Sequence, residues 1–265
     1  MKSIIKYYGG KTYMTDIILQ NFPTDYHIYV EGFGGGASVL FAKKPSPLEV
    51  YNDLGKNVYS LFKVISDKEK FKRLKERLDL TFYSNSIREE FKELLKRNDL
   101  DIEDRAYYFF FVNRSSFNGV GGFSRTMLVR RNMSKSVSDY LSAIDRLPEV
   151  HNRLSSVIID NQDIFCLIEK YNSENVFVYL DPPYIHETRK SNTNYEEEMS
   201  NEQHEMLVNT LLEFKGKFLL SGYNHEIYTP LTKKFGRYDF RSTNSGSCAT
   251  ESLWKNYWGC ISDNY

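Results

Sequence analysis

Short runs of strand-forming residues, each followed by a polar or glycine-containing segment, lie toward both ends of the chain. These runs occupy residues 27–31, 48–51, 157–160, 176–180 and 217–221. Apolar residues with helical spacing follow at residues 37–43, 164–171 and 202–214. Ser200 and Gln203 form a capping box for the last of these helices, and residues 238–261 have the pattern of a closing β-hairpin. The alternation predicts an α/β fold with a doubly wound sheet.

The middle of the chain has a different pattern. From residue 56 to about residue 97 the apolar positions have a helical period, and the aromatic residues 107–112 continue as a helix or a buried segment. Residues 113–136 are rich in Gly, Ser and Asn and are too long for an ordinary connection. We therefore expect one domain formed by residues 1–55 and 156–265, with a mostly helical domain inserted at residues 56–155.

Composition narrows the class of protein. Hydrophobic residues make up 41% of the chain and charged residues 26%, as in soluble globular proteins. No apolar stretch approaches the roughly 20 residues of a membrane span, and MKSIIKYYGGK lacks the apolar core of a signal peptide. Cys166, Cys248 and Cys260 are widely spaced and odd in number, which indicates a reducing compartment and no metal cluster. We expect a cytoplasmic protein without a metal.

Charge is unevenly distributed, although the formal net charge is zero. Residues 105–155 carry eight basic residues against three acidic ones. The basic residues are Arg105, Arg114, Arg125, Arg130, Arg131, Lys135, Arg146 and Arg153. A basic segment in a neutral chain indicates a local contact with a polyanion. A solvated charged face explains the charge equally well.

The first strand ends in an acid and a glycine loop. Glu31 is followed by Gly32-Phe33-Gly34-Gly35-Gly36. Such a loop lets the backbone approach a ligand closely, and Asp53, after the next strand, stands where an acid usually binds ribose hydroxyls. An acid before the glycines repels a pyrophosphate and favours a cationic nucleoside, a description that S-adenosylmethionine fits. The alternative is a glycine turn that serves close helix packing.

The strand at residues 176–180 stops at a second acid, in the stretch Asp181-Pro182-Pro183-Tyr184. A carboxylate and the carbonyl of Pro182 could accept the two hydrogens of an exocyclic amine, because Pro182 offers no N–H. Tyr184 adds a flat face for a base. The segment therefore suits an aminated nucleobase, and a strand end with a Pro-Pro stop is the structural alternative.

The motifs occur in one order along the chain. They are Lys6-Tyr7-Tyr8-Gly9-Gly10-Lys11, Glu31-Gly32-Phe33-Gly34-Gly35-Gly36, Asn52-Asp53-Leu54 and Asp181-Pro182-Pro183-Tyr184. In this order the sequence resembles the Dam-type DNA adenine-N6 methyltransferases over essentially its whole length. The segment 113–119, Asn-Arg-Ser-Ser-Phe-Asn-Gly, looks like the NR-x-x-[YF]-NG stretch of that family's target-recognition domain.

The resemblance implies a fold and an activity. The fold would be a Rossmann-like methyltransferase sheet with a closing β-hairpin, and residues 56–155 would form the target-recognition domain. The enzyme would transfer a methyl group from S-adenosylmethionine to N6 of adenine in a specific double-stranded DNA sequence, after flipping the base. It would act without a metal, as a monomer or weak dimer, for example in restriction-modification.

The resemblance also implies roles for individual residues. Asp181, Pro182 and Tyr184 would form the catalytic motif. Cofactor contacts would come from Tyr7, Lys11, Glu31, Phe33, Gly34, Gly35, Asp53 and Asp181, with Asp163 either a further cofactor contact or a helix N-terminal acid. Apart from the resemblance, the basic segment itself predicts DNA contacts, from Arg114, Asn118, Ser124, Arg125, Arg130 and Arg131. Gly119, Gly121 and Gly122 permit a tight hairpin there, which could enter a groove with its arginines along phosphates.

Two matters stay open at the level of sequence. GATC-reading relatives often carry an arginine at the position of Gly122, and the expected loop at residues 242–250 holds no Lys or Arg, so GATC specificity is not implied. The alternative activities are N4-cytosine methylation, a catalytically inactive DNA-binding relative, and a methyltransferase for RNA or small molecules.

Overall fold

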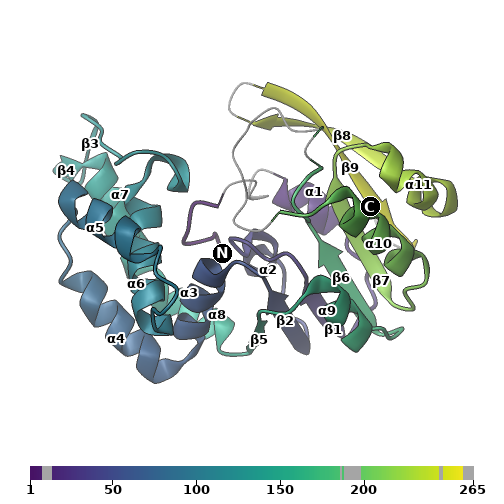
Figure 1. The fold of residues 1–265 in the computed structure, drawn as a ribbon, viewed down its shortest axis with the longest axis horizontal. Coiled ribbons are helices and arrows are strands. Elements are labelled where there is room, and N and C mark those ends of the chain that lie inside the picture. The colour runs from purple at the N-terminus through teal and green to yellow at the C-terminus, as the bar shows by residue number, and fades with distance from the viewer. Residues whose placement is uncertain (8–13, 186, 188–197, 245–246, 259–265) are drawn as a thin grey trace. The chain divides into compact units, whose positions relative to one another are not determined.

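The computed structural model describes residues 1–7, 14–185, 187, 198–244 and 247–258, without the side chains of residues 242–249. The chain divides into two compact units (Figure 1). The helical unit comprises Met1–Gly10, Gly35–Ala37 and Gly55–Ile159, and the sheet unit comprises Lys11–Gly34, Ser38–Leu54 and Asp160–Tyr265. Residues 1–10 and 35–37 thus group with the inserted helices, whereas the sequence suggested a division at residues 55 and 156.

The larger sheet of the described residues has seven strands. Their order is β5 (Val157–Asp160), β2 (Leu48–Asn52), β1 (Ile28–Glu31), β6 (Val176–Leu180), β7 (Lys217–Gly222), β9 (Ser247–Lys255) and β8 (Tyr238–Asn244). Strand β1 is parallel to β2 and β6, and β6 is parallel to β7. Strand β9 is antiparallel to both β7 and β8. The predicted α/β class and its closing hairpin are confirmed.

The two strands of the closing hairpin extend further toward its turn than the sequence indicated. Residues 242–250 were expected to be a loop, but most of them belong to β8 and β9. The ladder between these strands continues to the pair Asn244↔Ser247. The polar, glycine-containing stretch was read as a loop because its composition favours turns, yet the ladder with β9 overrides that preference.

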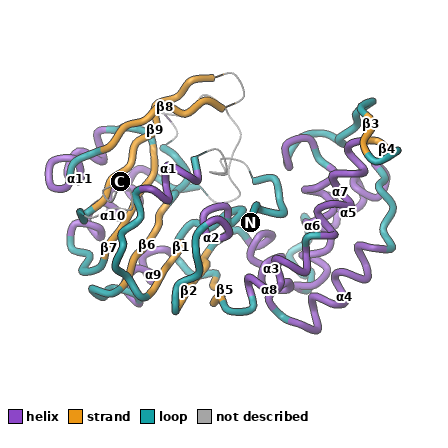
Figure 2. Tube along the Cα trace, turned by 180° about the vertical axis from the view of Figure 1, so that it is seen from behind, coloured by secondary structure: helices purple, strands orange, loops and turns teal. Residues whose placement is uncertain are grey.

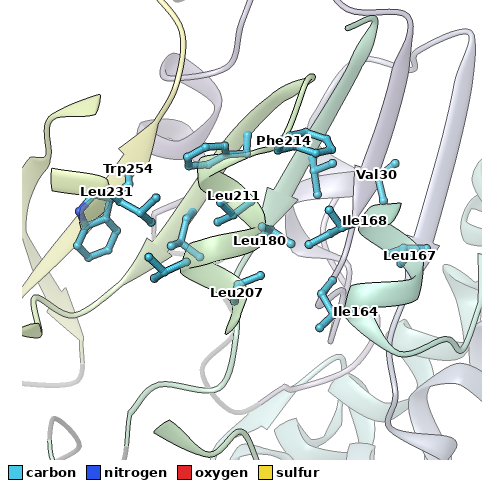
Figure 3. Packing of buried hydrophobic residues seen from close by; sticks show 14 of the residues in the cluster. Val30, Ile164, Leu167, Ile168, Leu180, Leu207, Leu211, Phe214, Leu231 and Trp254 are labelled. Carbon is cyan, nitrogen blue, oxygen red and sulfur yellow. The ribbon is translucent and has the colours of Figure 1, made fainter. Parts of the chain in front are cut away.

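One face of the sheet carries the aliphatic core. Three helices contribute to it, α9 (Ile164–Lys170), α10 (Asn201–Leu212) and α11 (Thr229–Phe235). Figure 3 shows Leu167, Leu207 and Leu211 gathered with strand residues such as Val30 and Leu180. The central strands read as continuous apolar runs because both faces of a parallel sheet are buried.

The opposite face is aromatic. Phe22 and Phe177 meet edge to face with ring centroids 4.6 Å apart, and Tyr29 and Tyr179 lie in the same cluster. The short helices α1 (Thr15–Gln20) and α2 (Ser38–Ala42) belong to the same unit. Side chains two residues apart on a strand share a face. Glu31 and Asp181 therefore extend from this aromatic face at the strand ends.

Helices dominate the other unit, as the purple tubes of Figure 2 show. They are α3 (Lys56–Ser66), α4 (Lys68–Asp79), α5 (Asn85–Leu94), α6 (Ile102–Ser115), α7 (Lys135–Asp145) and α8 (Leu147–Leu154). The helical stretch predicted at residues 56–97 is divided because Asp67 ends α3 and caps α4, accepting the amides of Glu69 and Lys70. Phe110 and Phe111 of α6 are fully buried, which confirms the predicted aromatic segment as a core helix.

Among the described residues, no helix is both long enough and apolar enough to cross a membrane. In the same part of the chain, no group of three or more His, Cys, Asp or Glu side chains could hold a metal ion.

Candidate active site and nucleic-acid surface

Three carboxylates stand at or just beyond the carboxyl ends of neighbouring strands. Glu31 ends β1, Asp53 follows β2, and Asp181 follows β6. The register pairs Glu31 with Tyr51 on one side and with Tyr179 on the other. The sheet therefore brings the acids of three separate sequence motifs to one edge, where α/β folds bind ligands.

Glu31 is buried at that edge. Its carboxylate accepts the hydroxyl proton of Tyr29 at 2.7 Å, and the Leu40 amide also donates to it. Burial raises the pKa of Glu31 to about 8, against these hydrogen bonds and the Lys43 ammonium, while Asp181 pushes it further up. Lys43 is itself held in a buried ion pair with Glu49. A cation bound close to Glu31 would favour the ionised form of this carboxylate.

The carboxylate of Asp181 is oriented from β7. Ser221 donates its hydroxyl proton to Oδ1 of Asp181 at 2.8 Å, and the hydroxyls of Ser221 and Tyr179 lie 3.1 Å apart. The β6–β7 register, which pairs Tyr179 with Leu219, brings residue 221 beside residue 181. Ser221 was missed from the sequence because this pairing depends on a strand 40 residues away.

The ring of Tyr184 is fixed on two sides. Its hydroxyl donates to Oε2 of Glu251 at 2.6 Å, and the Tyr223 ring lies 4.6 Å from it at an interplanar angle of 66°. Burial first, then the nearby carboxylates of Asp181 and Glu251, raises the pKa of Tyr184 well above its usual value. The phenol therefore stays protonated and can donate.

Asn52 holds the glycine loop in place, a role that was not predicted from the sequence. Its side-chain amide donates to the carbonyls of Gly32 and Gln162, both at 3.0 Å, and its Oδ1 accepts the Gln162 amide at 2.8 Å. Its backbone carbonyl accepts the Gly34 amide at 2.8 Å. One buried side chain thereby joins the loop after β1 to the loop after β5. The local signal was the Asn52-Asp53 pair at a strand end.

The remaining cofactor candidates occupy different surroundings. Phe33 is half-buried against the aliphatic core, and Asp163 is the exposed N-cap of α9, accepting the Phe165 amide at 2.9 Å. Tyr7 and Gly35 lie together in the helical unit, where a Cβ on Gly35 would be 2.6 Å from the Tyr7 ring. Lys11 lies outside the described residues.

Gly34→Ala is expected to destabilise the loop and weaken ligand binding. A Cβ at this position would lie 2.1 Å from the buried ring of Tyr51, so the alanine forces the loop or the ring to move. Overpacking of this kind costs about 1–3 kcal/mol. Thermal unfolding and calorimetric cofactor binding measure both effects. Gly122→Ala is the matched control, because nothing lies within 4 Å of its Cβ; equal behaviour of the two variants would contradict the assigned packing.

In the helical unit, the Asn113-Arg114 pair organises the backbone. The side-chain amide of Asn113 accepts a hydrogen bond from the backbone N–H of Lys6 at 2.9 Å and donates one to the backbone carbonyl of Lys6 at 2.8 Å. Arg114 donates to the carbonyl of Asp139 at 2.9 Å, and its burial lowers the pKa of the guanidinium. Arg114, a predicted DNA contact, is thus engaged within the protein and partly buried. This placement does not favour a direct contact between the Arg114 guanidinium and a DNA phosphate.

The glycines after Asn118 do not form the predicted hairpin. They lie in a separate small loop closed by the bridge Ser116↔Phe123. Arg88, which sequence reasoning missed, donates to Ser116 and to the Gly121 carbonyl and so holds this loop. Its partners are 28 and 33 residues away, beyond any local signal.

A hairpin is nevertheless present a few residues further on. Strand β3 (Val129–Arg130) pairs with β4 (Met133–Ser134). The connecting residues Arg131 and Asn132 have φ values of 54° and 57°, as a two-residue turn with both centres left-handed requires. The turn was therefore assigned to the wrong residues, because arginine is rare in this conformation and glycine is common.

The other predicted DNA contacts differ in exposure. Asn118 is exposed with a φ of 50°, whereas the Ser124 hydroxyl is partly buried against Ser136 at 3.2 Å. Arg125, Arg130 and Arg131 are exposed. Arg130 forms an exposed ion pair with Asp139, and Arg131 donates to Ser142. Exposed pairs of this kind are worth about 1 kcal/mol or less, so these cations can exchange partners.

Comparison with known proteins places these features in a family. Residues 7–244 match a model described as D12 class N6 adenine-specific DNA methyltransferase. The type II methyltransferase M.MjaIII of Methanocaldococcus jannaschii is 26% identical over 204 residues, 69% of each chain. M.CviBI of Paramecium bursaria Chlorella virus NC1A is 26% identical over 193 residues, also 69% of each chain. Modification methylase StsI of Streptococcus sanguinis is 26% identical over 199 residues, covering 70% of this chain and 29% of StsI.

Proposed function

We propose, for a chain that belongs to the D12 class N6 adenine-specific DNA methyltransferases, that S-adenosylmethionine is the methyl donor and binds at the carboxyl edge of β1 and β2. Membership of the family establishes the reaction: the enzyme methylates N6 of adenine in DNA. Buried Glu31, with its pKa raised to about 8 before a glycine loop, is the observation that carries the choice of donor. A cationic ligand relieves the cost of ionising that carboxylate.

The residues at this edge fit such a donor. Asp53 is suited to accept hydrogen bonds from ribose hydroxyls. Asn52 holds the glycine loop after β1, where Gly32 and Gly34 allow close packing against Leu180 and Tyr51. When bound, the donor supplies a methyl group on a sulfonium, which is a good leaving group. Neither Lys11 nor Asp163 is required for this proposal.

The acceptor amine is prepared by the segment after β6. Asp181, oriented by Ser221, and the Pro182 carbonyl accept the two amine hydrogens, which turns the nitrogen lone pair toward the methyl group. Tyr184 stacks on the adenine. The base reaches these groups by flipping out of the duplex, since its amine is otherwise paired and stacked. Rate acceleration then comes chiefly from alignment, and no strong base is needed because the methylated amine is acidic.

The helical unit is proposed to recognise a specific double-stranded sequence. The basic segment and the exposed β3–β4 hairpin support this assignment, with Arg125, Arg130 and Arg131 along phosphates and Asn118 toward base edges. Two of the relatives are named type II methyltransferases and the third a modification methylase. We propose the same setting, restriction-modification, for this chain.

The test is to express the chain in a host free of DNA methylation and to sequence the DNA with detection of modified bases. N6-methyladenine at one recurring sequence is the expected result. Modification of cytosine N4 would overturn the base assignment, and scattered methyladenine would overturn sequence recognition. The Asp181→Ala variant in the same host controls for background.

Replacing Arg130 and Arg131 together by alanine should weaken binding of specific and non-specific DNA alike. Phosphate contacts carry no sequence information, and losing one or two of them flattens the salt dependence by about one or two units of slope. Asn118→Ala should instead reduce discrimination between sites by about 1–3 kcal/mol, if it makes a paired contact to one base. Fluorescence anisotropy across a salt titration measures both quantities.

The matched control is Arg73→Ala with Arg97→Ala. Both arginines are exposed and paired to acids on the helical unit, as Arg130 is, but outside the hairpin. If the control pair lowers DNA affinity as much as the hairpin pair does, the effect is one of net charge and the hairpin has no special role.

A further inference from the structure

Tyr184 has a hydrogen-bond partner that the chemistry described so far does not use. Its hydroxyl donates to Glu251 at 2.6 Å, and the two side chains are 8% and 1% exposed. An acid this deeply buried is unusual unless it has a specific partner. A stacking ring alone needs no carboxylate, because phenylalanine would provide the same flat face.

The closing hairpin delivers this acid to the site. The register of β7 with β9 includes the pair Gly222↔Ser252. Tyr223 follows Gly222 and Glu251 precedes Ser252, so both reach the same end of the two strands. There the Tyr223 ring meets the Tyr184 ring at 66°, and Glu251 accepts the phenol proton. One contact from β9 and one from the residue that follows β7 fix the tilt of the Tyr184 ring.

Two carboxylates act on the Tyr184 hydroxyl: those of Glu251, which is buried, and of Asp181 both raise its pKa. Replacing a buried polar pair with apolar side chains of similar volume is often neutral or stabilising. A hydrogen-bonded acid in this position is therefore better explained by the geometry that it imposes than by stability.

We propose that Glu251 is a positioning residue: its carboxylate holds the Tyr184 ring at the tilt in which the ring stacks on the target adenine. This rests on the proposed function, which makes Tyr184 the stacking platform. Glu251 itself touches neither the amine nor the methyl group. It acts on the reaction through its hydrogen bond to Tyr184.

Glu251→Leu removes the acceptor with little change in volume. We expect kcat to fall by about 10- to 100-fold, the range that a small misplacement of a reacting group produces, while the dissociation constant for S-adenosylmethionine stays within about threefold. DNA carrying 2-aminopurine at the target position should show a smaller rise in fluorescence on binding, because the flipped base is less well held. Glu251→Gln keeps an acceptor of similar reach and should restore kcat to within about threefold of wild type.

A double-mutant cycle isolates the pair. Tyr184→Phe keeps the ring and removes the donor, so it should lower kcat by a factor similar to that of Glu251→Leu. The double variant should be no slower than either single variant, because both remove the same hydrogen bond. Independent, multiplying losses would mean that Glu251 acts by another route and would overturn the proposal.

Ser252→Ala is the structural control. It removes a neighbouring side-chain hydrogen bond of β9, from Ser252 to Asp239 at 2.7 Å. If Glu251→Leu loses activity only in proportion to its folded fraction, as this control should, the positioning role is wrong. Wild-type kcat and fluorescence in Glu251→Leu, or failure of Glu251→Gln to recover, would also overturn it. The proposed function fails separately, if the wild-type enzyme places no methyl group on adenine with S-adenosylmethionine.

Discussion

Asp181→Ala is expected to abolish methyl transfer while leaving the fold intact. The side chain stands beyond the end of β6 and contributes an acceptor at the site, with no part in either hydrophobic face of the sheet. Removing one preorganised polar contact to a reacting group typically costs about 100- to 1000-fold in kcat. Transfer of tritium from labelled S-adenosylmethionine to DNA, at saturating concentrations of both, measures the loss.

A graded series makes the result interpretable. Ser221→Ala, which releases Oδ1 of Asp181 without removing the acid, should give a smaller loss than Asp181→Ala. Asp25→Ala is a matched control on the same unit, because Asp25 is an exposed acid paired with Lys217. If Asp181→Ala keeps more than about a tenth of wild-type turnover, the acceptor role assigned to this carboxylate is wrong.

Binding of S-adenosylmethionine is expected to tighten steeply with pH. The pKa of Glu31 is raised to about 8 by burial, so at pH 6.0 about 1% of the carboxylates are ionised and at pH 7.5 about a quarter. If the cationic ligand binds the ionised form, its apparent dissociation constant falls by about 20-fold over this interval. Calorimetry from pH 6.0 to 7.5 measures the change.

Glu31→Gln is the control for this titration and should make the affinity independent of pH.

The same pKa shift predicts how the stability of the fold depends on pH. The pKa of Glu31 lies above its ordinary value of 4.5, so protonated Glu31 stabilises the ligand-free fold below pH 4.5, and that contribution is lost as pH rises through about 8. Glu31→Gln should therefore gain in melting temperature relative to wild type toward pH 8. A pH-independent affinity in wild type would assign Glu31 a structural role.

The features that could be predicted from the sequence are those that depend on a local pattern of residues. The run Val176–Leu180 is a strand over the predicted residues, and the Ser200–Gln203 capping box is present. Acids directly after strands could be located at the ligand-binding edge because parallel strands all end there. Such features need no knowledge of partners distant in sequence.

The site residues that could not be predicted from the sequence make contacts with residues far away along the chain. Ser221 and Glu251 lie 40 and 67 residues from Asp181 and Tyr184. Asn52 binds a loop 110 residues away. The hairpin turn at Arg131–Asn132 was missed for another reason: its flanking strands impose a backbone that arginine seldom adopts unaided.

The connectivity of the two units limits how this enzyme can be re-engineered. The chain passes between the units after Gly10, Gly34, Ala37, Leu54 and Ile159. Consider a chimera in which only residues 55–159 are replaced by those of a relative. Its residues at positions 113 and 119 would come from the relative, whereas the Lys6 segment that they contact would still be that of this chain. The Asn113 side chain forms two hydrogen bonds with the Lys6 backbone, and a Cβ on Gly119 would lie 2.2 Å from the Lys6 carbonyl oxygen. If the helical unit reads the DNA sequence, as proposed, an exchange of specificity requires a graft in which residues 1–7 travel with the helices.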